Sequence, residues 1–377
     1  MSENPLLIIP LMIVTLLTCS FLIGLGKFSV HKYDSLSRDS AIDGLRGLLS
    51  VSVLAHHFYI TYVWKISGSW VAPTQLPINN LGAISVSLFF MITGFLFIRK
   101  IKGGNIIWLD LYKGRLKRIY PLYIFIGIIV LIITLTSTKD EGVGLYRYIK
   151  SSLHWVFFSS YQVGTANTGR MIAGVNWTLL YEWGFYLSLP IIACFLNRKN
   201  KVTPMLIVLL PVLIYIFHIT SLKIYFLFAL SYLSTINATA IRNTIARFKV
   251  FSSILTLTLF MFTYNFTKAY SLLQMILVLL IFIMICNGES LFGFLKLKGM
   301  KVLGDISYSI YLTHGLVLYI SFSIVKIYDF NNGLLSYYLY YPLIVLVTIL
   351  VSFITYSFIE HPSFKAKKKR HLPQSTF

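Results

Sequence analysis

The chain contains 377 residues, of which 57% are hydrophobic, 16% aromatic and only 12% charged. Its mean hydropathy is +0.76, whereas a soluble domain carries about 25% charged residues. The composition therefore excludes an ordinary soluble domain and predicts an all-α polytopic protein embedded in the lipid bilayer. The formal net charge of +21 is also compatible with nucleic-acid binding. Because most lysines and arginines lie in short loops between apolar segments, we attribute the charge to membrane topology and expect no nucleic-acid partner.

A transmembrane helix needs about 20 mostly apolar residues, and eleven segments of the chain are predicted as spans on this basis. They lie near residues 6–26, 41–58, 81–98, 119–136, 177–197, 203–219, 224–239, 250–266, 271–286, 302–325 and 334–359. The division between the sixth and seventh is the weakest, because only the sequence ITSLK separates two apolar runs.

The positive charges predict which side of the membrane each loop faces. If residues 27–40 are cytoplasmic and the loops alternate from there, the cytoplasmic segments hold 24 lysines and arginines and the outside segments hold 7. This excess follows the positive-inside rule. It places the N-terminus outside and the basic tail, residues 363–377, in the cytoplasm.

Three further features limit the choice of function. The first apolar segment is expected to be a retained span, since no positive residue precedes it and no small-residue cleavage site follows it. The three cysteines lie within apolar segments without the spacing of metal ligands, so no metal site is predicted. The longest outside loop, residues 137–176, is either a binding element or a plain connector.

Residues 41–60 read AIDGLRGLLSVSVLAHHFYI, which is a membrane-spanning pattern that carries an acid, an arginine and two histidines. On a helix, Arg46 and His57 differ by only about 20° around the axis and are separated by about 16 Å along it. His56 points about 80° away from Arg46, so we expect it to pack or form hydrogen bonds elsewhere. Asp43 lies one turn before Arg46, where an ion pair is available.

An arginine near the inner face and a histidine deeper in the same helix suit a long anionic ligand that enters from the cytoplasm. The guanidinium of Arg46 would hold phosphate, and the imidazole of His57 would exchange protons at the reactive end. The alternative for this pair alone is structural: the arginine extends to the interface and the histidine is a satisfied core residue.

Other polar residues within apolar segments favour the functional interpretation. Glu182 lies six residues into a span, where a carboxylate is costly and is usually functional or paired. His314 lies within another span, with Tyr308 on a nearby turn. Arg115 and Arg118 share one helical face at the cytoplasmic end of a span, although topology alone also accounts for such charges.

Six motifs together resemble the acyltransferase-3 family of integral membrane O-acyltransferases. In chain order they read AIDGLRGLLSVSVLAHHF, SVSLFFMITGFLF, RLKRIYPLY, NWTLLYEWGFYL, VLGDISYSIYLTH and FIEHPSF. The resemblance covers about residues 40–362. It implies a membrane domain of ten helices over residues 41–362, preceded here by an extra span and linker in residues 1–40.

The resemblance also implies an activity. Such proteins take an acyl group, most often acetyl, from cytoplasmic acyl-CoA and transfer it to a sugar hydroxyl of a glycan or lipid-linked sugar outside the bacterial inner membrane. Acetyl-CoA is thus expected as a co-substrate, with no tightly bound cofactor. The family's arginine–histidine spacing falls on Arg46 and His57, and its second basic motif on Arg115 and Arg118. Glu182 matches the first of two adjacent acids often found in the family; here Trp183 replaces the second.

These observations lead to an expected mechanism. His57 is the general base on the sugar hydroxyl, or alternatively carries the acyl group covalently. Asp43 orients Arg46, or acts with His57 if the helix breaks near Gly44 and Gly47. The basic residues Arg46, Arg115 and Arg118 hold the donor phosphates. Glu182 is a further candidate catalytic residue, and it is expected to line the acceptor side together with the substrate-binding candidates Tyr308 and His314. A transporter or flippase of lipid-linked sugars or small molecules is the alternative function, since it also places polar groups near the midplane.

Overall fold

The computed structural model describes residues 4–26, 40–104, 106–137, 144–158, 162–163, 166–196, 213–215, 217–218, 220–236 and 238–365. These residues are mainly helical, and their only strands are a short antiparallel pair, β1 (Gln162–Val163) and β2 (Ala166–Asn167). The predicted all-α architecture is therefore confirmed for the described part of the chain. Most of the predicted span at 203–219, the linker 27–39 and the tail from residue 366 lie outside the described residues.

The helices follow one another along the whole chain, mostly joined by short connections. They are α1 (Ile8–Leu25), α2 (Ser40–Ser67), α3 (Leu76–Lys102), α4 (Trp108–Ser137), α5 (Leu145–Val156), α6 (Thr168–Met171), α7 (Trp177–Leu196), α9 (Leu222–Ser234), α10 (Thr239–Arg247), α11 (Lys249–Phe266), α12 (Leu272–Cys286), α13 (Lys298–Asp305), α14 (Ser307–Tyr319), α15 (Leu334–Tyr338), α16 (Tyr341–Thr355) and α17 (His361–Lys365).

The described residues contain five helices that are long and apolar enough to cross a membrane. They are Pro5–Leu25, Leu76–Lys102, Trp108–Thr136, Trp177–Leu196 and Leu334–Ser363, and the bent pair α9 and α10 makes a sixth if it is counted as one span. The protein is thus an integral membrane protein, but eleven spans are not found among these residues. Helix α2, with 28 residues, is long enough to cross a membrane. It is not one of these five helices because its polar and titratable residues lower its hydropathy.

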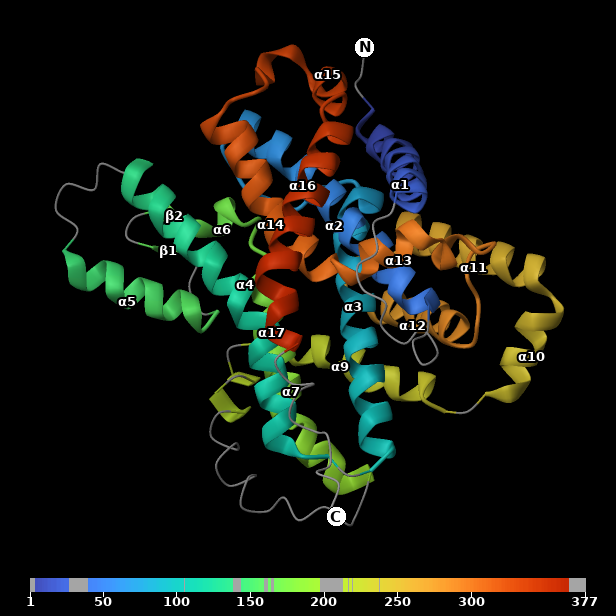
Figure 1. Ribbon diagram of the computed structural model, residues 1–377. Coiled ribbons are helices and arrows are strands. Elements are labelled where there is room, and N and C mark those ends of the chain that lie inside the picture. The colour runs from blue at the N-terminus through green and yellow to red at the C-terminus, as the bar shows by residue number, and fades with distance from the viewer. Residues whose placement is uncertain are drawn as a thin grey trace.

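Helix α2 lies in the middle of the bundle, packed against α3, α13 and α14 (Figure 1). Its contact with α13 is very close because glycines lie at the contact. A methyl group added to Gly304 would overlap the backbone carbonyl of Asp43, and one added to Gly47 would overlap that of Met300. Helix α2 is continuous through Gly44 and Gly47, so the helix break considered from the sequence does not occur.

The predicted span at residues 302–325 is divided in the structure. Helix α13 ends at Asp305, Ile306 interrupts the helical path, and α14 begins at Ser307 before passing into a π-helical turn at Ile320–Ile324. The sequence around the break, VLGDISYSI, mixes apolar and polar residues, but the segment as a whole is apolar enough to be predicted as one span. The division places the start of α14 beside the charged end of α2.

The segment between α4 and α7 is ordered where it is described. After α5 and the β1–β2 pair, α6 leads into a turn in which Ala173 and Gly174 have positive φ angles of 54° and 67°. This turn packs directly on α14, because a methyl group on Gly315 would overlap the backbone of Ile172 and Ala173. The segment therefore reaches the neighbourhood of His314, one residue before Gly315.

Candidate active site

A cavity of about 410 Å³ opens between the ends of α2, α3, α4, α7 and α14. Its lining includes five cationic side chains and two carboxylates. These are Arg46, Arg99, Lys100, Arg115, Arg118, Asp43 and Glu182. The excess of positive charge, within partly apolar walls, suits a ligand with several negative charges. The lining also contains Phe89, Thr178 and Tyr311.

Arg46 is held at the cavity by an ion pair within its own helix. Its Nη1 lies 3.9 Å from Oδ1 of Asp43, one turn earlier. The sequence correctly anticipates this pair. The carboxylate of Asp43 is far from His57 along the continuous helix, so the structure supports an orienting position for Asp43 and not the catalytic position also considered for it.

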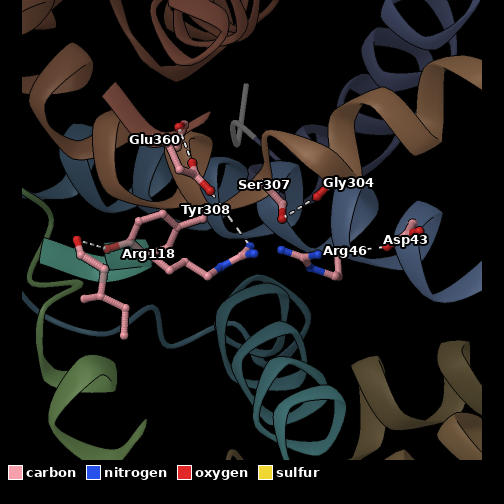
Figure 2. Close-up of polar contacts among 9 residues, drawn as sticks. Asp43, Arg46, Arg118, Gly304, Ser307, Tyr308 and Glu360 are labelled. Atoms are coloured by element: carbon pink, nitrogen blue, oxygen red, sulfur yellow. Dashed lines mark hydrogen bonds and ion pairs between the residues drawn. The ribbon is translucent and has the colours of Figure 1, made fainter. Parts of the chain in front are cut away.

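Arg118 is held from the opposite side of the cavity by a residue near the end of the chain. Its Nη2 lies 3.9 Å from Oε1 of the buried Glu360, whose other oxygen accepts a hydrogen bond of 2.9 Å from Ser309. Figure 2 shows the guanidinium groups of Arg118 and Arg46 pointing toward one another. Two like charges facing across a cavity are stabilised by an anion between them.

Arg115 and Glu182 line the same cavity, together with Tyr186. The guanidinium of Arg115 lies 5.1 Å from the ring centre of Phe97 and 6.0 Å from that of Tyr186. The hydroxyl of Tyr186 donates a hydrogen bond of 2.9 Å to Oε2 of Glu182. Glu182 was expected on the acceptor side, but the structure places it among the arginines, because α7 brings its first turns against α4.

Tyr308 also differs from the expectation. It lines the arginine cavity, and its hydroxyl donates a 2.8 Å hydrogen bond to the backbone carbonyl of Ile119 (Figure 2). The break at Ile306 explains this position, because it places the first turn of α14 beside α4 at the level of Arg118. Tyr308 therefore belongs to the cationic end of the site and not to the side where His314 lies.

His57 is paired with His314. Nδ1 of His57 lies 3.0 Å from Nε2 of His314, and the two rings stack with centroids 5.1 Å apart. His314 is fully buried, and its Nδ1 lies 3.1 Å from the backbone carbonyl of Ile310. Helix α14 lines the cavity beside Arg46 with Ser307 and contacts His57 two turns later with His314. Arg46 and His57 of α2 therefore both face α14.

His56 is directed elsewhere, as its helical angle predicts. Its Nδ1 donates a 2.9 Å hydrogen bond to the backbone carbonyl of Ile78 on α3. The ring fits there because the facing residue is Gly82, on which any side chain would contact the imidazole. The two adjacent histidines are therefore not equivalent, and the prediction that His56 forms its hydrogen bond away from Arg46 is confirmed.

The cavity and the histidine pair are neighbours but are not continuous. Among the described residues, the cavity lining includes Arg46 but not His57. The rings of Tyr311 and Phe89, which are 6.0 Å apart, stand at its inner end. Tyr311 is in turn 6.1 Å from the ring of His314. The ring of Tyr311 therefore lies between the cavity lining and the histidine pair.

Several residues at the site were not identified from the sequence. Glu360 lies in the last of the six motifs, and that motif was the available signal for it. Asn176 is fully buried, and neither atom of its side-chain amide has a hydrogen-bond partner among the described residues. Trp70, whose ring lies 6.3 Å from that of His57, comes from the connection after α2 and carried no signal.

Comparison with known proteins identifies the family. The family model for an acyltransferase domain, the acyltransferase-3 model, matches residues 39–357. The chain belongs to the acyltransferase-3 family. The matched region contains every residue of the site described above except Glu360, and it excludes α1. No solved structure matches the chain.

Curated relatives of this acyltransferase-3 chain match it over part of their length. The "Putative acetyltransferase ORF330" of Acidianus two-tailed virus is 30% identical over 41% of this chain and 41% of its own length. Acyltransferase MdmB of Streptomyces mycarofaciens is 27% identical over 40% of this chain and 38% of its own length. O-acetyltransferase OatA of Staphylococcus aureus is 24% identical over 42% of this chain and 25% of its own length. The chain thus matches less than half the length of each relative.

Proposed function

We propose that the protein is a membrane O-acyltransferase that moves an acyl group, most simply acetyl, from acyl-CoA to a sugar hydroxyl. The observation that carries the proposal is a cavity with five cationic side chains whose inner end adjoins the His57–His314 pair. Family membership and the acetyltransferase and acyltransferase names of the relatives support the reaction type.

The cationic cavity is the donor site. Coenzyme A carries several phosphate charges at one end and a thioester at the other, so it needs cations far from the reacting atom. Arg46, Arg115 and Arg118 provide guanidinium groups that bind phosphate oxygens through paired hydrogen bonds. Asp43 and Glu360 orient two of these arginines from opposite sides. The positive-inside rule places this end of the bundle at the cytoplasm, where acyl-CoA is made.

The histidine pair supplies the base. The carbonyl of Ile310 only accepts hydrogen bonds, so Nδ1 of His314 carries the proton and its Nε2 is an acceptor. His57 then donates from Nδ1 to His314, and its Nε2 has the lone pair. His314 is therefore a positioning residue that fixes the reactive nitrogen of His57.

The reaction requires one proton transfer in each direction. Nε2 of His57 takes the proton of the acceptor hydroxyl as its oxygen attacks the thioester carbonyl carbon. The carbon–sulfur bond then breaks, and the thiolate of coenzyme A receives the proton from the imidazolium. The hydroxyl of Thr178 donates to the carbonyl of Val175, and that of Tyr311 is joined to Thr178 by a 3.0 Å hydrogen bond in the cavity lining. Once Tyr311 rotates away from Thr178, its hydroxyl can donate to the developing oxyanion. The thioester reaches His57 when Tyr311 and Phe89 rotate apart.

Purified protein in lipid nanodiscs tests the proposal with radiolabelled acetyl-CoA and a mixture of saccharides. We expect label to become ester-linked to saccharide with the wild type. His57→Ala should abolish transfer while acetyl-CoA still binds, and Arg118→Ala should raise the KM for acetyl-CoA. Lys113→Ala is the matched control, because Lys113 lies on the same helix as Arg118 but is exposed and outside this cavity. Full transfer by His57→Ala would disprove the mechanism.

A further inference from the structure

Three aromatic side chains continue from His57 on the side away from Arg46. The ring of Trp70 lies 6.3 Å from His57, that of Trp64 lies 5.5 Å from Trp70, and that of Tyr319 lies 6.4 Å from Trp64. Each of the three is partly exposed. We call Trp64, Trp70 and Tyr319 the outer aromatic cluster. His57 is also partly exposed and does not line the donor cavity, so its open side is compatible with this cluster.

A cation from a distant segment completes the cluster. The guanidinium of Arg170, on α6, lies 5.6 Å from the ring centre of Trp64. Its Nε is buried and has no hydrogen-bond partner among the described residues. A buried N–H without a hydrogen-bond partner is unfavourable, so we attribute this geometry to a partner that arrives with a ligand.

The position of this charge also needs an explanation. Arg170 and Lys65 both lie on the side that the charge distribution places outside the cell, where cations are scarce, and both lie over the ring of Trp64. An aromatic belt at the membrane interface accounts for isolated tryptophans. Such a belt does not explain why the rings of Tyr319, Trp64 and Trp70 form a row that ends at the imidazole of His57. It also does not explain why Lys65 and Arg170, from two different segments, both lie over Trp64.

From these contacts we infer that the outer aromatic cluster and Arg170 form the acceptor subsite, and that the acceptor is a saccharide with a negatively charged group, such as a carboxylate, near the hydroxyl to be acylated. This inference rests on the proposed function and adds the chemical class of its acceptor. Flat aromatic faces stack against the C–H faces of sugar rings. Arg170 binds the anionic group through charged hydrogen bonds, and Trp70 holds the sugar ring beside His57.

The packing of α6 explains how Arg170 is held in place. The turn after α6 lies against Gly315 of α14, next to His314, and its Val175 packs with Val53 and Tyr311. The outer subsite and the histidine pair therefore share one rigid support.

Binding to two oligosaccharides of the same length tests the inference. Hyaluronan tetrasaccharide carries glucuronate carboxylates, and chitotetraose is its neutral counterpart. Binding is followed by tryptophan fluorescence and calorimetry with the full chain in phosphatidylcholine nanodiscs, which contain no lipid of net negative charge. We expect the wild type to bind hyaluronan tetrasaccharide about tenfold more tightly than chitotetraose, as one charged hydrogen-bonded contact predicts.

The variants separate the two parts of the subsite. Arg170→Gln should remove the preference for the anionic sugar, and Arg170→Lys should retain part of it. Trp64→Ala should weaken both sugars alike. Lys268→Gln, an exposed cation on the same side but outside the cluster, should bind as the wild type does. Acetyl-CoA binding, measured in parallel, shows that each variant is folded.

Two results would overturn the inference. One is equal or absent binding of the two sugars by wild-type protein that binds acetyl-CoA. The other is an unchanged preference in Arg170→Gln. Neither result disproves the proposed function, which fails only if labelled acetyl does not move from acetyl-CoA to any saccharide.

Discussion

In the proposed mechanism, the reactive nitrogen of His57 is selected by a residue that belongs to another helix. The contact between Nδ1 of His57 and Nε2 of His314, combined with the contact between His314 and the carbonyl of Ile310, leaves Nε2 of His57 to act as the proposed base. The logic is that of a catalytic triad, in which a third group fixes the tautomer and orientation of the base. Here the third group is a neutral imidazole, which orients the base without the charge of a carboxylate.

This arrangement predicts separate effects for the two histidines. His314→Ala should lower kcat about 10- to 100-fold and leave the KM for acetyl-CoA nearly unchanged, because His314 positions the base and touches no phosphate. His314→Gln should recover part of the rate, since its carboxamide oxygen accepts a hydrogen bond from His57. Initial rates at saturating acetyl-CoA measure both effects. An equal loss of kcat in the Ala and Gln variants would contradict the positioning role.

At the scale of elements, the close contact between α2 and α13 sets the height of Arg46 in the bundle. A methyl group at Gly304 overlaps the carbonyl oxygen and carbon of Asp43. These are backbone atoms, which cannot rotate away as a side chain can. Gly304→Ala should therefore lower the free energy of unfolding by about 1–3 kcal/mol and raise the KM for acetyl-CoA. Gly114→Ala, at a helical glycine with open space around it, is the control. Thermal unfolding in detergent distinguishes the two; equal stability of both variants would contradict the contact.

Hydrogen bonds to one buried carboxylate hold the connection between α12 and α13 in place. The buried carboxylate of Glu289 accepts hydrogen bonds from the side chains of Ser252 and Ser253 and from the backbone N–H groups of Ser290 and Leu291. Burial raises the pKa of Glu289, but these hydrogen bonds lower it by more, so its pKa lies below the ordinary value.

The sign of that shift gives a pH prediction. Because the folded-state pKa of Glu289 is depressed, its stabilisation is fully present above the unfolded-state pKa and is lost as the pH falls through the folded-state pKa. Glu289→Gln should therefore melt at a lower temperature than the wild type at pH 7, and the difference should shrink below about pH 4. Melting curves at pH 7, 5 and 3.5 measure it. A difference in Tm that stays constant with pH would mean that the carboxylate charge does not contribute.

At the scale of the whole molecule, the proposed donor and acceptor sites lie toward opposite ends of α2. The cationic cavity lies at the end that carries Arg46 and the outer aromatic cluster at the end that carries Trp64, with the ring of Tyr311 and the histidine pair between them. In the proposed mechanism, transfer needs the rotation of side chains and not the movement of whole domains.

This orientation is testable by labelling from each side. With the native cysteines Cys19, Cys194 and Cys286 replaced by serine, a single cysteine at exposed Arg147 should react with a membrane-impermeant maleimide added to intact cells. A cysteine at exposed Lys113 should react only after the cells are opened. The reverse pattern would place the cationic cavity outside the cell and remove acyl-CoA as its ligand.

The sequence by itself determined what depends on local periodicity and composition. The polar content of α2 is read directly from its residues. Helix geometry within this one segment then gives the shared face of Arg46 and His57, the Asp43–Arg46 pair and the separate direction of His56. The family followed from motifs in chain order. Helix boundaries were less accurate, since residues 302–325 were predicted as one span and the structure interrupts the helix at Ile306.

Only the tertiary structure decided which side chains from different segments meet. The His57–His314 hydrogen bond, the ion pair between Arg118 and Glu360, and the placement of Glu182 and Tyr308 among the arginines each join helices far apart in the chain. Periodicity states which face of a helix a residue occupies, but not which helix it faces. That choice depends on close backbone contacts at residues such as Gly304 and Gly315, and these contacts exist only when the whole bundle is packed.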